Sequence, residues 1–331
     1  MLILAKSILG LMLGFVLSLI TAVLIIPLLR RLKAGQTVSR LINKRHLKKD
    51  GTPTMGGLIF ILPTIAVMAL LYLRGSIEIT ASLVIVIFVF LAYAILGFVD
   101  DYLKVKFKSN GGFKTLTKLF FQVVIALVFY FIFINVHQGD PTLIITSLGI
   151  YIPMGWFFGI FILLVLVGTT NAVNITDGLD GLCGGLSVMA FLAFGVMAWG
   201  TTWLIGNEEL AIFSFVLVGS LMGFLVFNAH PAKVFMGDTG SLALGGALAT
   251  IAILTRHELS LVLIGGVFVL ETLSSLIQII SIRKFKKKVF LKAPLHHHFE
   301  ELGWVETDIV RLFWVVGLLL AMLGIIYSVW L

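Results

Sequence analysis

The chain is poor in charge and almost devoid of cysteine. Of its 331 residues, 24 are Lys or Arg and 16 are Asp or Glu, so only 12% carry formal charge, roughly half the fraction found in a soluble domain. The hydrophobic share is 60% and the mean hydropathy is +1.12. These values exclude a soluble globule, a disordered tail and a fibrous repeat. The single cysteine, Cys183, forms no internal disulfide and builds no cysteine metal cluster, so we interpret it as a small buried side chain.

The gaps between charges mark the membrane spans, because a charge at the bilayer centre is costly and a span takes about 20 apolar residues. We predict an all-α polytopic membrane protein that forms one integral-membrane catalytic domain over residues 1–331. Its ten spans are residues 7–29, 53–73, 79–99, 119–136, 154–173, 184–203, 210–228, 240–255, 259–282 and 312–330. The first segment is too long for a secretory signal, so we interpret it as an uncleaved helix. A short β-hairpin outside the membrane is predicted before the fifth span.

The basic residues are distributed unevenly between the two sides of the predicted membrane. Of the 24, 21 fall in loops that follow odd-numbered spans. Because Lys and Arg are enriched in cytoplasmic loops, we expect these loops in the cytoplasm and both termini outside. The chain contains neither a G-x-x-x-x-G-K-[ST] phosphate loop nor a G-x-G-x-x-G fingerprint. The protein is therefore expected to act without NTPase machinery of its own.

Ten of the 16 acidic residues fall in the loops that we expect in the cytoplasm. Asp100 and Asp101 follow the third apolar run, so we predict them at the C-terminal end of a helix, where the helix dipole and their mutual repulsion disfavour them. A bound cation, most simply Mg²⁺, or a charged substrate would compensate them, because Mg²⁺ binds carboxylates together with substrate phosphates. The alternative is a pair of solvated acids paired with Lys104 and Lys106.

Two further cytoplasmic loops hold carboxylates and amides. In residues 171–182, Asp177 and Asp180 would share one face if this segment were helical, whereas two Asp-Gly turns explain the same residues. Between the seventh and eighth spans, Asp238 is either the N-cap of the following helix or a metal ligand beside a helix start that attracts anions. The sequence leaves both pairs of readings open.

The last cytoplasmic loop and the ninth span add a histidine cluster and a lone acid. His296, His297 and His298 are consecutive and cannot all reach one zinc ion, whereas imidazoles facing phosphate oxygens suit an anionic substrate. Glu271 lies within a span, where an acid is a functional-site candidate by default. An interhelical hydrogen bond is the structural alternative, and a proton or ion pathway is the rival function. Together these features indicate a Mg²⁺-dependent enzyme acting on a phosphorylated lipid or nucleotide.

The motifs resemble those of the bacterial phospho-N-acetylmuramoyl-pentapeptide transferase family, a branch of the polyprenyl-phosphate N-acetylhexosamine-1-phosphate transferase superfamily. The matching segments are residues 49–57 (KDGTPTMGG), 100–102 (DDY), 171–182, 235–241 (FMGDTGS) and 294–300 (PLHHHFE). The resemblance implies transfer of phospho-MurNAc-pentapeptide from UDP-MurNAc-pentapeptide to undecaprenyl phosphate, giving lipid I and UMP. It also implies a multi-pass protein of the bacterial inner membrane with its active site on the cytoplasmic face.

The resemblance assigns roles to individual residues. Asp238, Asp101 and Asn174 are the expected Mg²⁺ ligands, and Asp100 is expected to deprotonate or orient the lipid phosphate. The predicted catalytic residues are Asp100, Asp101, Lys118, Asp238, His296, His297 and His298. The predicted substrate-binding residues are Lys49, Thr54, Asn174, Asp177, Gly178, Leu179, Asp180, Asn228, Phe235, Gly237, Ser241 and Glu271, with Phe235 stacking on uracil.

Two alternative functions follow from the same residues. The first is transfer of a plain N-acetylhexosamine phosphate, and the second is a cation-coupled transporter, motivated by Glu271 and the ten spans.

For the transfer of phospho-MurNAc-pentapeptide, a single displacement is preferred, and a route through a phospho-enzyme stays open. The expected partners are UDP-MurNAc-pentapeptide, undecaprenyl phosphate and the lipid bilayer, with no nucleic acid. The sequence leaves open whether the chain forms a homodimer.

Overall fold

The computed structural model describes residues 2–32, 51–107, 111–145, 148–200 and 207–329. Within these ranges nine helices are long and apolar enough to cross a membrane. They are α1 (Leu2–Arg31), α3 (Ala81–Phe107), α4 (Thr115–Asn135), α5 (Phe157–Thr176), α6 (Leu182–Gly200), α7 (Asn207–Asn228), α8 (Gly237–Leu254), α10 (Gly266–Phe285) and α12 (Glu306–Val329). The prediction of an all-α polytopic membrane protein is confirmed.

The remaining elements are short. They are α2 (Leu58–Leu73), α9 (Ser260–Ile264), α11 (Leu295–Glu301) and the strands β1 (Thr142–Ile145) and β2 (Ile150–Pro153). The two strands are antiparallel, with Thr142 opposite Pro153 and Ile145 opposite Ile150. They precede α5, where the sequence indicated a hairpin, and their position outside the membrane stays a prediction.

Three of the predicted spans differ clearly from the observed helices. The second, residues 53–73, corresponds to α2, which has only 16 residues and is not among the nine long apolar helices of the described residues. The third span was predicted to end at residue 99, but α3 continues to Phe107, so the prediction that Asp100 and Asp101 lie at a helix end is wrong. Both carboxylates are buried and interact with protein groups, Asp100 with Lys104 and Asp101 with Thr239. They therefore do not have to reach water at the membrane surface, and the helix can continue past them. The ninth span is divided at Gly265 into α9 and α10.

The core of the bundle is α8. Every residue from Thr239 to Leu254 is buried, and α8 packs between α3 and α5. The contact with α3 is close because Gly97 lies directly against the backbone of Asp238, where a Cβ atom would collide with the carbonyl group. By contrast, α1, α4, α10 and α12 leave many large apolar side chains exposed, as expected for helices that face lipid.

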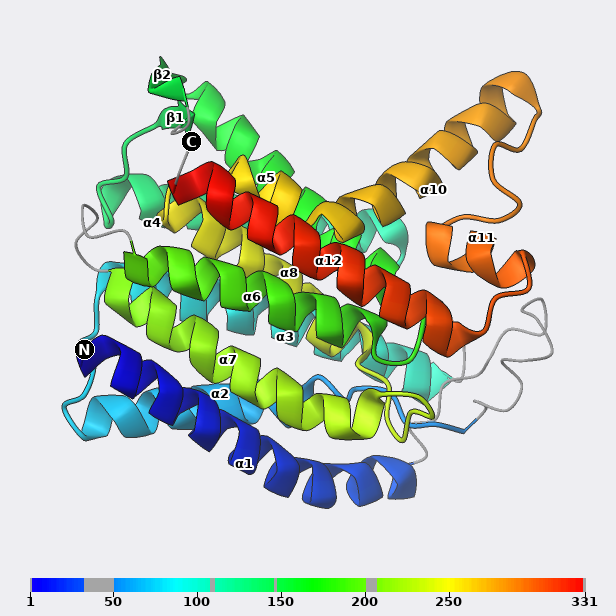
Figure 1. Ribbon diagram of the computed structural model, residues 1–331, viewed down its shortest axis with the longest axis horizontal. Helices are drawn as coiled ribbons and strands as arrows, with labels where there is room; N and C mark the ends of the chain where they lie inside the picture. The colour runs from blue at the N-terminus through cyan, green and yellow to red at the C-terminus, as the bar shows by residue number, and fades with distance from the viewer. Residues whose placement is uncertain (1, 33–50, 108–110, 146–147, 201–206, 330–331) are drawn as a thin grey trace.

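The bundle has two distinct ends. Figure 1 shows the start of α1, the end of α12 and the β1–β2 pair at one end, and α11 at the opposite end. From the middle of the bundle α10 extends away from its neighbours, and the chain then returns to α11 beside the start of α12 (Figure 1). The basic last turns of α1, α3 and α10 also lie toward the α11 end, which we expect to face the cytoplasm.

Candidate active site

Three predicted aspartates converge on one ammonium group. The Nζ atom of Lys104 lies 2.7 Å from an oxygen of Asp100, 3.7 Å from one of Asp101 and 2.9 Å from one of Asp238. Asp100 and Lys104 are one helical turn apart on α3, which places them on one face, and Asp238 comes from the first turn of α8. The other oxygen of Asp100 accepts a hydrogen bond from the Phe113 amide at 2.5 Å. Asp100 and Asp101 are each 2% exposed, so they are not the solvated acids of the alternative reading.

Asp101 caps the start of α8 from the neighbouring helix. Its Oδ1 atom accepts a hydrogen bond from the Asp238 amide at 3.2 Å, and its Oδ2 atom accepts from the Thr239 amide and hydroxyl at 2.9 and 2.7 Å. Amides in the first turn of a helix have no partner within the helix. The interpretation of Asp238 as the N-cap is wrong, because the N-cap residue is Met236 and the cap is supplied by α3.

Lys118 and Asn174 hold the Asp238 carboxylate. Lys118 Nζ lies 2.5 Å from Oδ2 of Asp238, and the Asn174 side-chain amide donates to Oδ1 of Asp238 and to the Ser241 hydroxyl, both at 2.8 Å. The structure therefore brings together six of the predicted site residues: Asp100, Asp101, Lys118, Asn174, Asp238 and Ser241.

Lys104 was missed as a site residue, although its spacing of four from Asp100 was a signal for an ion pair. Sequence analysis considered Lys104 and Lys106 only as partners of solvated acids. The ammonium group of Lys106 instead lies 5.9 Å from the ring centroids of both Tyr102 and Phe107. Only one of the two lysines thus belongs to the aspartate cluster.

The segment after α5 is a turn. Helix α5 ends at Thr176 and Gly181 has a φ of +79°, so the turn reading of residues 177–181 holds and the helical reading is wrong. The Gly181 amide donates to Oδ1 of Asn228 at 3.1 Å, and the Asn228 side-chain amide donates to the Val234 carbonyl at 3.0 Å. Asn228 is 3% exposed, and it joins the turn to the loop that leads into α8.

Asp177 lies in this turn and is partly buried. Burial, followed by the negative charges of Asp238 and Asp101, raises the pKa of Asp177 to about 7. The turn therefore belongs to the same electrostatic environment as the three converging aspartates. Leu179, which was predicted to contact substrate, is buried beneath the turn.

Asp180 belongs to a second polar cluster that sequence analysis missed. Its Oδ2 atom lies 3.1 Å from Nδ1 of His230 and accepts from the Ala232 amide at 3.1 Å. Glu306 accepts a hydrogen bond from the Asp180 amide at 2.8 Å, and its other oxygen lies 3.7 Å from His230 Nδ1. Ligand atoms of Asp180, His230 and Glu306 lie within 4.8 Å of one another, a spacing that these contacts explain. Asp180 lies in the turn after α5, His230 in the loop before α8 and Glu306 at the start of α12, so no local sequence pattern pointed to them.

Two of the motif segments meet through their backbones. The Phe235 amide donates to the Pro53 carbonyl at 2.8 Å, and the Gly56 amide donates to the Phe235 carbonyl at 2.8 Å. This pairing brings Thr54 beside Gly237 and leaves the Phe235 ring partly exposed. Lys49, the other residue predicted in this region, lies outside the described residues.

The three histidines lie on α11 and have different partners. Nδ1 of His296 lies 2.9 Å from Oε2 of Glu271, and Nδ1 of His297 lies 2.6 Å from Oε2 of Glu300. Nδ1 of His298 accepts a backbone hydrogen bond from the preceding loop. Burial lowers the pKa of His297, against the opposing effect of its hydrogen bond to Glu300. These separate partners agree with the expectation that the three imidazoles do not share one ion.

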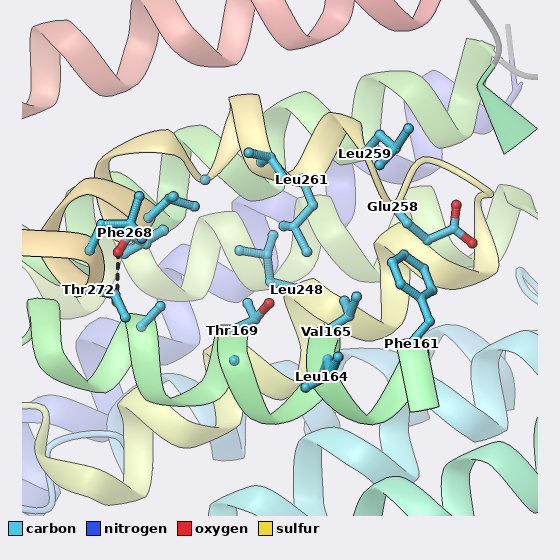
Figure 2. Close-up of a pocket in the computed structure, with 16 residues that line it drawn as sticks. Phe161, Leu164, Val165, Thr169, Leu248, Glu258, Leu259, Leu261, Phe268 and Thr272 are labelled. Carbon is cyan, nitrogen blue, oxygen red and sulfur yellow. Dashed lines mark hydrogen bonds between the residues drawn. The ribbon is translucent and has the colours of Figure 1, made fainter. Parts of the chain in front are cut away.

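An apolar pocket of about 250 Å³ lies between α5, α8 and the α9–α10 segment. Figure 2 shows Val165 of α5, Leu248 of α8, Leu261 of α9 and Phe268 of α10 around it. Near one end the Thr272 hydroxyl donates to the Phe268 carbonyl at 2.9 Å, so its polar atom is satisfied within α10. Apart from Thr169, Thr272 and Glu258, the side chains that line it are apolar, and an apolar lining of this kind accommodates hydrocarbon.

Comparison with known proteins identifies the family. The sequence model of Glycosyl transferase family 4 matches residues 82–256, and phospho-N-acetylmuramoyl-pentapeptide-transferase signature 1 matches residues 49–61. The phospho-N-acetylmuramoyl-pentapeptide-transferase of Bacillus licheniformis is 50% identical over 320 residues, which is 96% of each chain. The proteins of that name from Bacillus subtilis (strain 168) and Geobacillus sp. (strain WCH70) are 49% and 50% identical, over 97% and 98% of each chain. The chain therefore belongs to the phospho-N-acetylmuramoyl-pentapeptide transferase family and is a membrane-embedded phosphotransferase.

Proposed function

We propose that the protein transfers phospho-MurNAc-pentapeptide from UDP-MurNAc-pentapeptide to undecaprenyl phosphate. An oxygen of the lipid phosphate bonds to the sugar-linked phosphorus, the bond from that phosphorus to the bridging oxygen breaks, and UMP leaves with the electron pair. Lipid I is the other product. One phosphoanhydride replaces another, so the reaction needs no ATP. The observation that carries this proposal is the convergence of Asp100, Asp101 and Asp238 on one cation position.

Mg²⁺ is the cofactor that we propose for this cluster. The donor chemistry fits, because three carboxylates lie within 3.7 Å of a single ammonium nitrogen and hard divalent ions take carboxylate oxygens together with substrate phosphates. Asp238 would be the leading ligand, with Asp101 and Asn174 as further candidates. Both Asp101 oxygens already cap α8, so its main contribution is to fix Asp238. When bound, the ion would neutralise and polarise the diphosphate.

The remaining residues of the cluster act on the phosphates. Lys104 and Lys118 would stabilise negative charge as the phosphorus–oxygen bond breaks, because fixed cations in a partly buried site stabilise developing charge effectively. Asp100 would orient the lipid phosphate for in-line attack. A phosphate monoester is already largely ionised near neutral pH, so we assign Asp100 to positioning more than to proton removal.

We place the nucleotide on the turn at residues 177–181 and on Phe235. The partly exposed ring of Phe235 offers a stacking surface for the uracil, and the exposed Gly178 leaves room above the turn. The prenyl chain would enter the apolar pocket of Figure 2 from the bilayer. We place the active site at the α11 end of the bundle, where the basic ends of α1, α3 and α10 lie. This end would be the cytoplasmic face of the bacterial inner membrane.

The alternatives are less well supported. The signature match at residues 49–61 favours the pentapeptide substrate over a plain N-acetylhexosamine phosphate. Glu271 is hydrogen-bonded to His296 between α10 and α11, which supports the interhelical hydrogen bond over the ion pathway that a transporter would need. A homodimer, which the sequence leaves open, is not part of this proposal.

Substrate competition tests the proposed function. Purified protein in undecaprenyl-phosphate vesicles with Mg²⁺ would receive UDP-MurNAc-pentapeptide or UDP-GlcNAc in parallel, and UMP release would be measured. We expect lipid-dependent UMP release from the pentapeptide substrate alone. Equal release from UDP-GlcNAc would identify the plain hexosamine transferase, and no release from either substrate would contradict the proposed activity.

A further inference from the structure

Glu271 and His296 form a buried pair that joins α10 to α11. Glu271 is 0% exposed and His296 is 1% exposed. Oε1 of Glu271 accepts from the His296 backbone amide at 3.1 Å, while Oε2 lies 2.9 Å from the imidazole Nδ1. Neither side chain therefore presents an accessible surface to a substrate, although both were predicted to contact one.

The same pair reaches the turn after α5. The Nε2 edge of the His296 ring lies directly against Gly178, so that a Cβ atom on Gly178 would overlap this nitrogen. Gly178 is exposed on its other side. The imidazole thus lies beneath the turn, and the opposite surface of the turn faces outward.

Helix α10 also holds the segment that leads into α11. The side-chain oxygen of Gln278 accepts from the Val289 and Phe290 amides, both at 3.0 Å, and its nitrogen donates to the Phe290 carbonyl at 2.9 Å. Glu271 and Gln278 are seven residues apart and so share one face of α10. This face determines where α11, and with it His296, is held.

We propose that Glu271 and His296 are positioning residues that support the turn at Gly178 from below and thereby set the affinity for the nucleoside diphosphate of the substrate. This inference rests on the proposed function. It replaces the predicted direct contacts of these two residues with an indirect role: α10 holds the imidazole through Glu271, and the imidazole holds the turn.

The two oxygens of Glu271 orient the His296 ring. One faces the His296 amide and the other faces Nδ1, and a carboxylate can accept from both. A glutamine at this position has one acceptor oxygen and one donor NH₂ group. When its oxygen accepts from the His296 amide, its NH₂ group faces Nδ1, so that Nδ1 can no longer donate to it. The substitution Glu271→Gln keeps the side-chain volume and changes the hydrogen bond that orients the ring.

The test separates nucleotide binding from turnover. For Glu271→Gln we expect the KM for UDP-MurNAc-pentapeptide and the Kd for UMP to rise on the order of 10-fold, within the range for groups that orient a histidine. The KM for undecaprenyl phosphate and kcat at saturating nucleotide should stay within about threefold, because loss of uniform binding leaves kcat unchanged. Glu301→Gln is the matched control, since Glu301 lies on α11, the helix of His296, with its side chain exposed, and its nucleotide KM should equal that of the wild type.

A second variant and a spectroscopic signal distinguish the positioning role from a general loss of folded protein. Gly178→Ala pushes on the same contact from the other side and should also raise the nucleotide KM. In ¹⁵N-histidine NMR spectra, the His296 resonance pair, assigned with His296→Asn, should show a protonated Nδ1 in the wild type and lose that pattern in Glu271→Gln. A fall in kcat with unchanged nucleotide KM would overturn the positioning role, as would an unchanged Nδ1 signal. If the wild type releases no UMP, the proposed function fails, which is a separate outcome.

Discussion

Asp101 on α3 holds Thr239 on α8 through one oxygen atom, which accepts from both the amide and the hydroxyl of that threonine. The neighbouring amide, that of Asp238, donates to the other Asp101 oxygen. The helix that carries Asp238 is therefore fixed by the carboxylate beside Asp100. Two adjacent acids thus have different tasks, because one faces the lysines and the other faces a helix N-terminus.

Asp101→Asn should destabilise the fold as well as the activity. An asparagine NH₂ group would oppose at least one of the three α8 donors, and an unsatisfied buried donor costs about 1–3 kcal/mol. We expect a lower Tm in a thermal unfolding assay in detergent and strongly reduced UMP release. Thr239→Val removes only the hydroxyl hydrogen bond and should cost about 1 kcal/mol. A wild-type Tm for Asp101→Asn would show that the cap contributes little.

Gly97→Ala tests the close packing of α3 on α8. Alanine is favoured over glycine within a helix by about 1 kcal/mol, yet here the new methyl would meet the backbone carbonyl of Asp238, which cannot rotate away. The Tm should fall and activity should be lost. Gly168→Ala is the control, because among the described residues no atom would lie within 4 Å of its Cβ. Equal Tm changes for the two variants would contradict the packing argument.

Glu258, in the connection between α8 and α9, makes the stability depend on pH. Burial raises its pKa to about 7, against smaller opposing effects of its own backbone amide and of Arg256. Because the folded state binds this proton more tightly than the unfolded chain, the resulting stability is complete below about pH 4.5 and is lost as the pH rises to about 7. Glu258→Gln should remove this loss, so that the variant has the higher Tm at pH 8 and a similar Tm at pH 4.5. Parallel Tm curves for the two proteins across this range would contradict the assignment.

Phe235→Ala tests the proposed uracil contact. If the ring stacks on the base, the KM for UDP-MurNAc-pentapeptide should rise on the order of 10-fold or more, since base stacking on an aromatic side chain is worth about 1–3 kcal/mol. The KM for undecaprenyl phosphate should change little. Steady-state kinetics with each substrate varied in turn make the comparison, and equal increases in both KM values would argue against stacking.

The sequence predicted the helical architecture because apolar length is a local property. Charge spacing located most of the spans to within several residues. It ended the third span too early, because hydropathy treats the carboxylates of Asp100 and Asp101 as the end of a helix. In the structure Lys104 supplies the countercharge within the same helix, so the helix continues. The division of the ninth span at Gly265 depends on how α9 and α10 pack against their neighbours, which local patterns do not encode.

The sequence identified many residues of the candidate site, but it did not show which of them contact one another. Motif resemblance selected Asp238, Asn174 and Lys118, and the structure brings these side chains into contact. The contacts of His230 with Asp180 and Glu306 join segments that are far apart in the chain, so spacing gave no signal for them. The burial of single side chains was not predictable either. Glu271 was expected to contact substrate, but its carboxylate is buried and hydrogen-bonded to His296 of α11.

Mg²⁺-dependent UMP release by Asp238→Asn tests whether Asp238 holds the Mg²⁺ ion that phosphoryl transfer requires. The wild type and the variant would be compared in undecaprenyl-phosphate vesicles with UDP-MurNAc-pentapeptide, with and without Mg²⁺, after thermal unfolding has shown that both are folded. We expect rapid release by the wild type only when lipid and Mg²⁺ are both present. The variant should release UMP at least roughly 100-fold more slowly, which is the scale of losing one charge-stabilising group. Near-normal, Mg²⁺-dependent turnover by Asp238→Asn would contradict this role of Asp238.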